Sequence, residues 1–164
     1  MATVNKNLGT SVSMTVTNLS SLASSATAGW QSARVDDTST KAIDYQLEVK
    51  LTMANTAPSN DKAVYVYVSP AYYDGSAWYQ TDGGTTTLPG GSEATYTIAS
   101  PNDLKLLGIL NYTTQNMVLQ GQFNLSNVFG NTTPDGFQLV IVNYTGAAVT
   151  AAVVAYKPIT FTVA

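Results

Sequence analysis

The chain has 164 residues, only 10% of them charged, a net charge of −3, and neither histidine nor cysteine. Its seven lysines and arginines are scattered singly, so it lacks the basic surface stripe typical of nucleic-acid-binding proteins. Without histidine or cysteine, the chain has no Ser-His-Asp or Cys-His catalysis, no disulfides and no imidazole or thiolate metal sites. One domain is expected, stabilised by packing or by contacts between subunits.

Segments that cross or address membranes are missing from the sequence. No run approaches the roughly 20 apolar residues of a membrane span, and the N-terminus has no charged-then-apolar secretion signal. We therefore expect a protein without a membrane partner, which works where it is made or leaves the cell as part of an assembly.

The first ten residues are mostly polar, with Val4 and Leu8 as the main apolar side chains. A segment with so little apolar surface does not fix itself to a core. We therefore predict a flexible N-terminal arm over residues 1–10 and a folded domain over residues 11–164. Val4 and Leu8 are the candidate contacts of this arm with a partner.

The next segments suggest short strands and a loop. Residues 12–17 alternate apolar and polar side chains, which predicts a strand. Residues 19–29 are rich in serine and alanine without a clear period, and we interpret them as a loop. Residues 30–35 are expected to form another short strand.

Two longer runs dominate the sequence. Residues 43–53 alternate without a break, so they predict a long strand with one apolar and one polar face. Residues 63–69 place valines on one face and Tyr65 and Tyr67 on the other. Because a single sandwich usually leaves one sheet face wet, a partner subunit is the expected cover for these tyrosines.

Turn residues fill the segment from residue 70 to residue 91. An Asp-Gly pair at Asp74 predicts a hairpin turn. Four aromatic residues flank this turn: Tyr72, Tyr73, Trp78 and Tyr79. They form either a platform on which sugars stack or anchors of a protein interface, and we favour the interface because aromatic residues are enriched there.

The second half of the chain continues with short segments. Strands are predicted at residues 92–98, 105–110, 115–120 and 123–125, with a helix-start pattern at residues 100–103 and one helical turn at residues 124–129. Residues 136–144 are almost continuously apolar, as in a central strand covered on both faces. Residues 151–156 and 159–163 are two more strands, separated at Pro158 because proline cannot donate to a ladder.

Together these segments predict an all-β fold with about eight to ten strands and no long helix. Strands separated by turns at roughly 8 to 12 residues indicate a single antiparallel β-sandwich, with a jelly roll as the expected topology.

Carboxylates are the remaining residues with catalytic chemistry. A glycosidase needs two of them about 5 to 9.5 Å apart, and the candidate pairs are Asp74 with Asp82 and Asp36 with Asp37. Aspartate in Asp-Gly turns usually serves the backbone, and a calcium site needs several more oxygen ligands than Asp36 and Asp37 offer. We therefore predict no enzyme activity, catalytic residue, cofactor or metal.

Several stretches are similar to small virion structural proteins of tailed bacteriophages, including capsid decoration, or cement, proteins. The most specific is Asn-Asp-Lys-Ala-Val-Tyr-Val-Tyr at residues 60–67, and further similar stretches lie at residues 37–40, 54–58, 104–108 and 143–147. The resemblance spans roughly residues 37–148. It implies a β-sandwich or jelly-roll module, commonly a homotrimer, on the outside of the head.

From this resemblance we expect a non-enzymatic decoration protein that is made in the host cytoplasm and binds the major capsid protein on the outer virion surface. The alternative is a head-fibre or tail domain that binds a receptor carbohydrate through residues 72–79.

Overall fold

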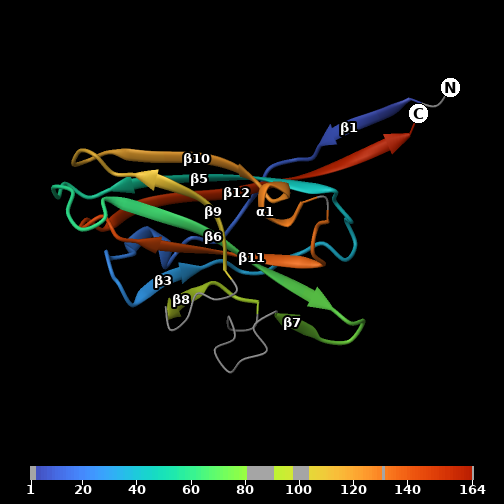
Figure 1. The fold of residues 1–164 in the computed structure, drawn as a ribbon, viewed down its shortest axis with the longest axis horizontal. Coiled ribbons are helices and arrows are strands. Elements are labelled where there is room, and N and C mark those ends of the chain that lie inside the picture. The colour runs from blue at the N-terminus through green and yellow to red at the C-terminus, as the bar shows by residue number, and fades with distance from the viewer. Residues whose placement is uncertain (1–2, 81–90, 98–103, 131, 164) are drawn as a thin grey trace.

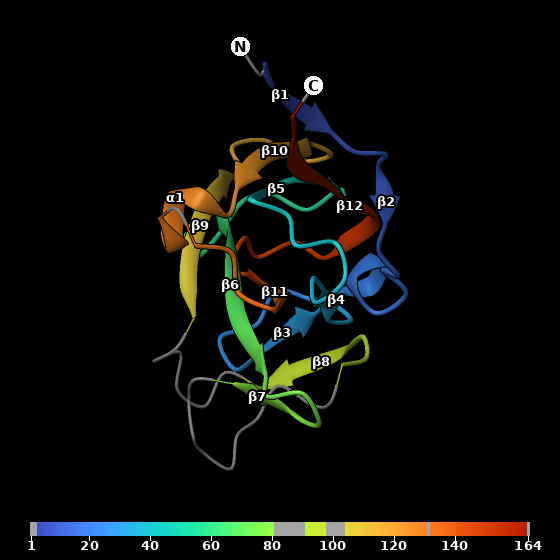
Figure 2. The ribbon, with the colours of Figure 1, turned by 90° about the vertical axis from the view of Figure 1, so that its right-hand side faces the viewer.

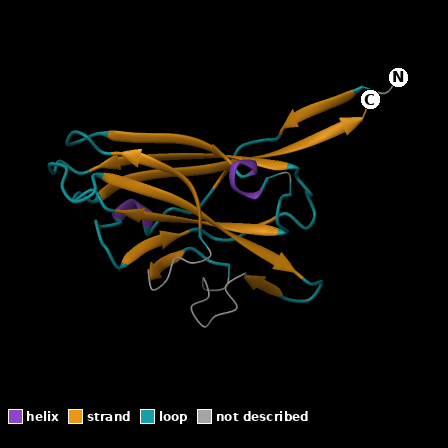
Figure 3. Ribbon diagram, in the orientation of Figure 1, coloured by secondary structure: helices purple, strands orange, loops and turns teal. Residues whose placement is uncertain are grey.

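A computed structural model describes residues 3–80, 91–97, 104–130 and 132–163 of the chain. In these parts the fold is almost entirely β (Figure 3). The strands are β1 (Val4–Leu8), β2 (Val12–Ser13), β3 (Ala28–Gln31), β4 (Val35–Asp36), β5 (Asp44–Met53), β6 (Ala63–Tyr73), β7 (Trp78–Gln80), β8 (Ala94–Thr97), β9 (Lys105–Asn111), β10 (Val118–Asn124), β11 (Gly136–Asn143) and β12 (Val149–Val163). The helices are a 3-10 turn at Leu19–Ser21 and α1 (Ser126–Phe129).

The strands form two antiparallel sheets, which curl around a common interior (Figure 2). One sheet has the order β1-β12-β5-β10, with β2 also pairing to β12. The other has the order β7-β6-β11-β3-β8, with β4 pairing to β11 and β9 to β6. The all-β expectation is confirmed. Among the described residues, no helix is long and apolar enough to cross a lipid bilayer.

The interior is filled by side chains of β5, β6 and β11, the strands whose apolar pattern is clearest in the sequence. In β5 the side chains of Leu47, Val49 and Leu51 are fully buried, as the alternation predicted. They belong to one hydrophobic cluster with the alternating valines of β6. Every residue of β11 is buried, and this strand lies between β6 on one side and β3 and β4 on the other, so the prediction of a central strand is confirmed.

The predicted break at Pro158 is wrong, because β12 runs through it from Val149 to Val163. The Gly9 N–H donates to the Pro158 carbonyl at 2.8 Å, so the nitrogen of Pro158 also faces the edge that carries β1 and β2. Along that edge, β1 ends opposite Ile159 and β2 begins opposite Tyr156. The proline therefore occupies a gap between two short strands, where no ladder hydrogen bond needs its missing donor.

Pro70 occupies a matching position in β6, which is longer than predicted. The Tyr144 N–H donates to the Ala63 carbonyl, so by alternation the nitrogen of Pro70 points away from β11. On that outer edge, β9 pairs with β6 as far as Val68 and β7 starts opposite Ala71. A long strand thus tolerates a proline wherever two short strands share its edge.

The shorter segments agree with the sequence in part. The hairpin at Asp74 and the helical turn ended by Gly130 are confirmed. The strand predicted at residues 12–17 is only Val12–Ser13. In place of the two strands predicted at residues 115–120 and 123–125 there is one strand, β10, from Val118 to Asn124. The helix start predicted at residues 100–103 lies outside the described residues.

Within residues 1–10, which were predicted as a flexible N-terminal arm, Val4–Leu8 is strand β1. It pairs antiparallel with β12, from Val4 opposite Val163 to Leu8 opposite Ile159. Sequence reasoning missed it because its partner lies at the other end of the chain.

Candidate functional site: the terminal ribbon and a polar pocket

The strand β1 and the last residues of β12 leave the body of the fold together as a two-stranded ribbon (Figure 1). We call β1 and residues 159–163 the terminal ribbon. Figure 2 shows the same projection from the side, with both described chain ends close together. The ribbon is the most prominent feature outside the body.

One face of the terminal ribbon is exposed and mostly apolar, with Lys6 as its one charged side chain, opposite Phe161. Cross-strand register and alternation place Val4 and Leu8 on the same face as Phe161 and Val163. Their exposed fractions are 61% for Val4, 53% for Leu8, 54% for Phe161 and 71% for Val163. The opposite face is polar, and there the Asn7 amide donates to the Thr162 hydroxyl at 3.0 Å.

Val4 and Leu8 are among the contact residues predicted from the sequence, whereas Phe161 and Val163 are not. The alternation of Ile159, Phe161 and Val163 with two threonines was visible in the sequence. It predicts a strand but not its exposure, because nothing in the sequence shows that this end of β12 continues beyond its neighbour β5.

At the base of the ribbon lies a groove of roughly 340 Å³, lined by Lys6, Ile43, Asp44, Ser126 and Phe161 among others. The Asp44 carboxylate accepts hydrogen bonds from Ser126 N–H and hydroxyl and from the Asn124 amide, at 2.8 to 2.9 Å. Burial alone would raise the pKa of Asp44, but these hydrogen bonds outweigh it and hold the pKa below its ordinary value. Asp44 is thus an ionised structural acceptor that fastens α1 to β5.

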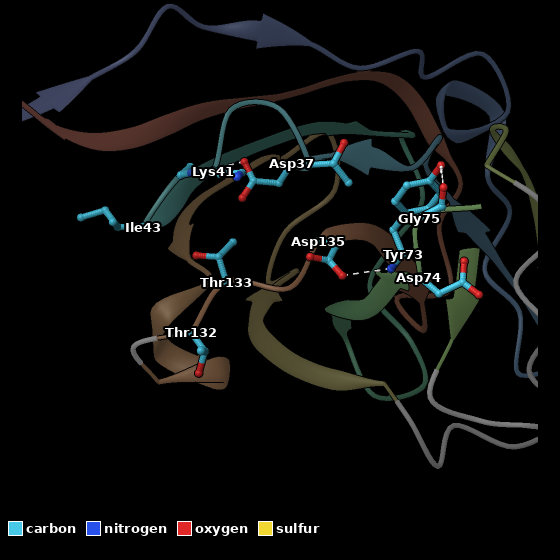
Figure 4. Close-up of a pocket in the computed structure, with 11 residues that line it drawn as sticks. Asp37, Lys41, Ile43, Tyr73, Asp74, Gly75, Thr132, Thr133 and Asp135 are labelled. Carbon is cyan, nitrogen blue, oxygen red and sulfur yellow. Dashed lines mark hydrogen bonds between the residues drawn. The ribbon is translucent and has the colours of Figure 1, made fainter. Parts of the chain in front are cut away.

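A second hollow, a polar pocket of roughly 610 Å³, lies on another part of the surface (Figure 4). In that view Asp135 lies between Thr133 and Tyr73, with Lys41 and Asp37 above them. The Asp135 carboxylate accepts the Tyr73 N–H at 2.9 Å. The pocket therefore offers carboxylate and hydroxyl oxygens beside one aromatic ring.

The candidate catalytic carboxylates that the structure describes are engaged in local structure. Asp37 is buried and accepts hydrogen bonds from the Ala42 N–H and the Tyr45 hydroxyl. Asp36 accepts two hydrogen bonds from Thr38, which lower its pKa.

Asp74 serves the hairpin in the same way. It accepts the N–H groups of Ala77 and Ser76 at 2.8 Å, and these bonds lower its pKa to about 2. A carboxyl group with so low a pKa does not donate a proton at neutral pH. Asp82, its proposed partner, lies outside the described residues, and no group of three or more metal-ligating side chains occurs within the described parts.

The four aromatic residues of the hairpin do not form one platform. Tyr72 pairs with Tyr79 across the hairpin, and Tyr73 pairs with Trp78, so the two pairs point to opposite faces. The rings of Tyr73 and Trp78 lie 5.1 Å apart, and the Arg34 guanidinium sits 4.1 Å from the Trp78 ring centre. The Trp78 face is therefore occupied, while Tyr72 and Tyr79 are exposed.

Tyr65 and Tyr67 lie together on the outer face of the seven-stranded sheet. Their rings stack at 6.2 Å, and Tyr65 also meets Tyr144 edge-on at 5.6 Å. They pack over the buried side chains of Val140 and Val142. Much of their cover therefore comes from the same chain.

The comparisons with known proteins add no relative: no protein-family model matches the chain, and no curated protein matches it significantly.

Proposed function

We propose that the chain is a non-enzymatic decoration, or cement, protein that binds the outer surface of an assembled tailed-phage head and stabilises the shell. The observation that carries this proposal is the terminal ribbon, which holds a row of large apolar side chains away from the body. In this proposal the sheets form one jelly-roll sandwich, the copies are trimers, and the partner is the major capsid protein.

An exposed ribbon of this kind is unfavourable unless a partner covers it. A two-stranded ribbon is marginally stable in water, because its apolar face and main-chain edges lack partners. Exposed apolar rows of this kind are typical of interaction sites. A protein that binds the assembled shell better than free subunits stabilises the shell by mass action.

Two other properties support a structural role. Only 10% of the residues are charged, and charged residues are also depleted in the core of protein interfaces. The described carboxylates that were candidates for catalysis serve turns and strand ends instead. The stretch at residues 60–67 resembles phage virion proteins, which makes a phage head the proposed assembly.

The test compares two valines with similar exposure. Val4 lies on the ribbon, whereas Val153 lies on the part of β12 within the body and is 57% exposed. We expect Val4→Ser to lower the number of copies bound per particle and Val153→Ser to leave it unchanged. Particles lacking the protein should release DNA at a lower temperature. Unchanged particle stability, or equal binding of both variants, would refute the proposal.

A second candidate function is carbohydrate binding by a head-fibre or tail receptor-binding domain. One observation favours it: the polar pocket places acceptor oxygens of Asp135 and Thr133 beside Tyr73. Protein sites for sugars combine polar groups with an aromatic wall in this way. Copy number distinguishes the candidates, because a cement protein co-purifies in hundreds of copies per particle and a fibre domain in far fewer.

A further inference from the structure

We propose that two copies of this chain pair with each other through the free edge of β12 at residues 161–163. The pairing makes a continuous four-stranded sheet, β1-β12-β12-β1, across a two-fold axis. It depends on the ribbon geometry alone and does not require the partner to be a phage head.

The edge of β12 at residues 161–163 is open because the neighbouring strand β5 begins only at Asp44, opposite Ile159. The pairing of β5 with β12 ends with Asp44 opposite Ile159, and the Ile43 N–H donates to the Ile159 carbonyl at 2.9 Å. Main-chain groups alternate between the two sides of a strand, so those of Phe161 and Val163 point to the same side as Ile159. Within the described parts of the chain, no strand pairs with them there.

A two-fold antiparallel pairing at this edge is self-complementary in one register. It sets Phe161 of each copy opposite Val163 of the other, and Thr162 opposite Thr162. The two Phe–Val pairs satisfy the open N–H and carbonyl groups on both sides, and they lie on the apolar face. Aromatic with β-branched pairs and threonine pairs are both favourable across strands.

The neighbouring register is worse for a reason visible in the structure. If Phe161 faced Phe161, then Val163 would face Ile159, whose carbonyl already accepts the Ile43 N–H. The register centred on Thr162 avoids this residue. It also points the two bodies in opposite directions, because antiparallel strands run away from each other beyond the axis.

The other free edge of the ribbon belongs to β1 and suits self-pairing less well. A two-fold axis through its middle would set Lys6 opposite Lys6, and like charges directly opposite destabilise a sheet. Residues 160–163 carry no charge. The β12 edge is therefore better suited than the β1 edge to pairing with a second copy.

This contact is small, so it becomes strong only where copies are held close together. Concentrating modules on a common scaffold raises their effective concentration without any new contact. Pairing also places the exposed apolar faces of two ribbons side by side. Because it is two-fold, it is separate from the three-fold contact of the trimer proposed above.

Single-cysteine cross-linking tests the register directly, since the chain has no cysteine. Opposed residues in a non-hydrogen-bonded pair have Cα atoms about 4.5 Å apart, within the distance that a disulfide spans. Thr162→Cys should therefore form a disulfide-linked dimer under mild oxidation.

The matched control is Asn5→Cys. Asn5 is exposed on the same polar face and is the register partner of Thr162 on β1. Across the proposed axis the two copies of Asn5 stand three strand spacings apart, roughly 14 Å, which is too far for a disulfide. We expect Thr162→Cys to cross-link at least about tenfold faster than Asn5→Cys.

A second variant tests the hydrogen bonds of the edge. In Val163→Pro the missing N–H lies on the open side, so the ladder with β1 stays intact. Added to Thr162→Cys, it should slow cross-linking to the rate of the Asn5→Cys control. Sedimentation equilibrium of the unmodified chain should show a mass that rises with concentration.

Three results would overturn this inference. They are equal cross-linking rates for Thr162→Cys and Asn5→Cys, no effect of Val163→Pro, and a monomer mass at every concentration. The two cross-linking results do not affect the shell proposal, which is judged by the number of copies of the Val4→Ser variant bound per particle. A monomer mass at every concentration would also count against a trimer formed in solution.

Discussion

The hydroxyl of Tyr45 donates a hydrogen bond to the buried carboxylate of Asp37 at 2.5 Å. It joins the start of β5 to the loop that lines the polar pocket. Burial raises the pKa of Tyr45, and the bond to Asp37 raises it further.

We expect Tyr45→Phe to lower the free energy of unfolding by about 1.5 to 3 kcal/mol, because the Asp37 carboxylate loses the hydrogen bond that the Tyr45 hydroxyl donates to it. Chemical denaturation measures this change. Tyr72→Phe, at an exposed position on β6, should change the stability little. Equal effects of the two variants would mean that this bond does not hold the loop.

Asp44 makes the fold sensitive to acid. Its pKa is lower in the folded than in the unfolded protein, so its stabilising effect is complete above the unfolded pKa of about 4 and disappears as the pH falls through the folded pKa. Asp44→Asn should destabilise the protein at pH 7 and flatten the loss of stability below pH 4. Denaturation curves from pH 2 to pH 7 test this, with the exposed Asp61→Asn as control.

Alanine variants of two glycines with positive φ distinguish the cost of backbone strain from the cost of steric overlap. Gly75 has φ +100° and open space where a Cβ would stand, whereas Gly146 has φ +81° and would place a Cβ 1.8 Å from Ser59 Oγ. Gly75→Ala should cost about 1 to 2 kcal/mol through strain alone. Gly146→Ala should cost clearly more, because Ser59 is held by the Thr145 carbonyl. Equal melting temperatures of the two variants would contradict this account.

If the aromatic hairpin is not a sugar site, titration with host polysaccharide should give no saturable signal. Isothermal titration calorimetry measures this for the unmodified chain. Saturable binding that disappears in Tyr73→Ala but persists in Tyr79→Ala would place the sugar in the polar pocket and favour the receptor-binding alternative. Tyr73 lines that pocket, whereas Tyr79 pairs with Tyr72 on the opposite face of the hairpin.

The sequence was informative where burial follows a local period. Strand β5 and the central strand β11 could be read from their side chains, because each has a face, or both faces, in the core. The hairpin at Asp74 was visible for a similar reason, since an Asp-Gly turn acts locally.

What the sequence did not reveal depends on partners far along the chain. Whether Pro158 breaks a strand depends on the gap between β1 and β2. Whether Val4 belongs to a strand depends on its pairing with Val163. The division of the hairpin aromatics between two faces is different, because it is local and the two-residue alternation of the strands predicts it.

The ladder between β1 and β12 joins residues far apart in the chain, with Asn7 and Thr162 separated by 155 positions. A ribosome therefore releases β1 long before its only described partner strand exists. Closing a loop of this length costs entropy that is recovered only after the body has formed. We infer that the ribbon is the last part of the fold to assemble, so the apolar row needed for docking is completed only on a chain whose core is already folded.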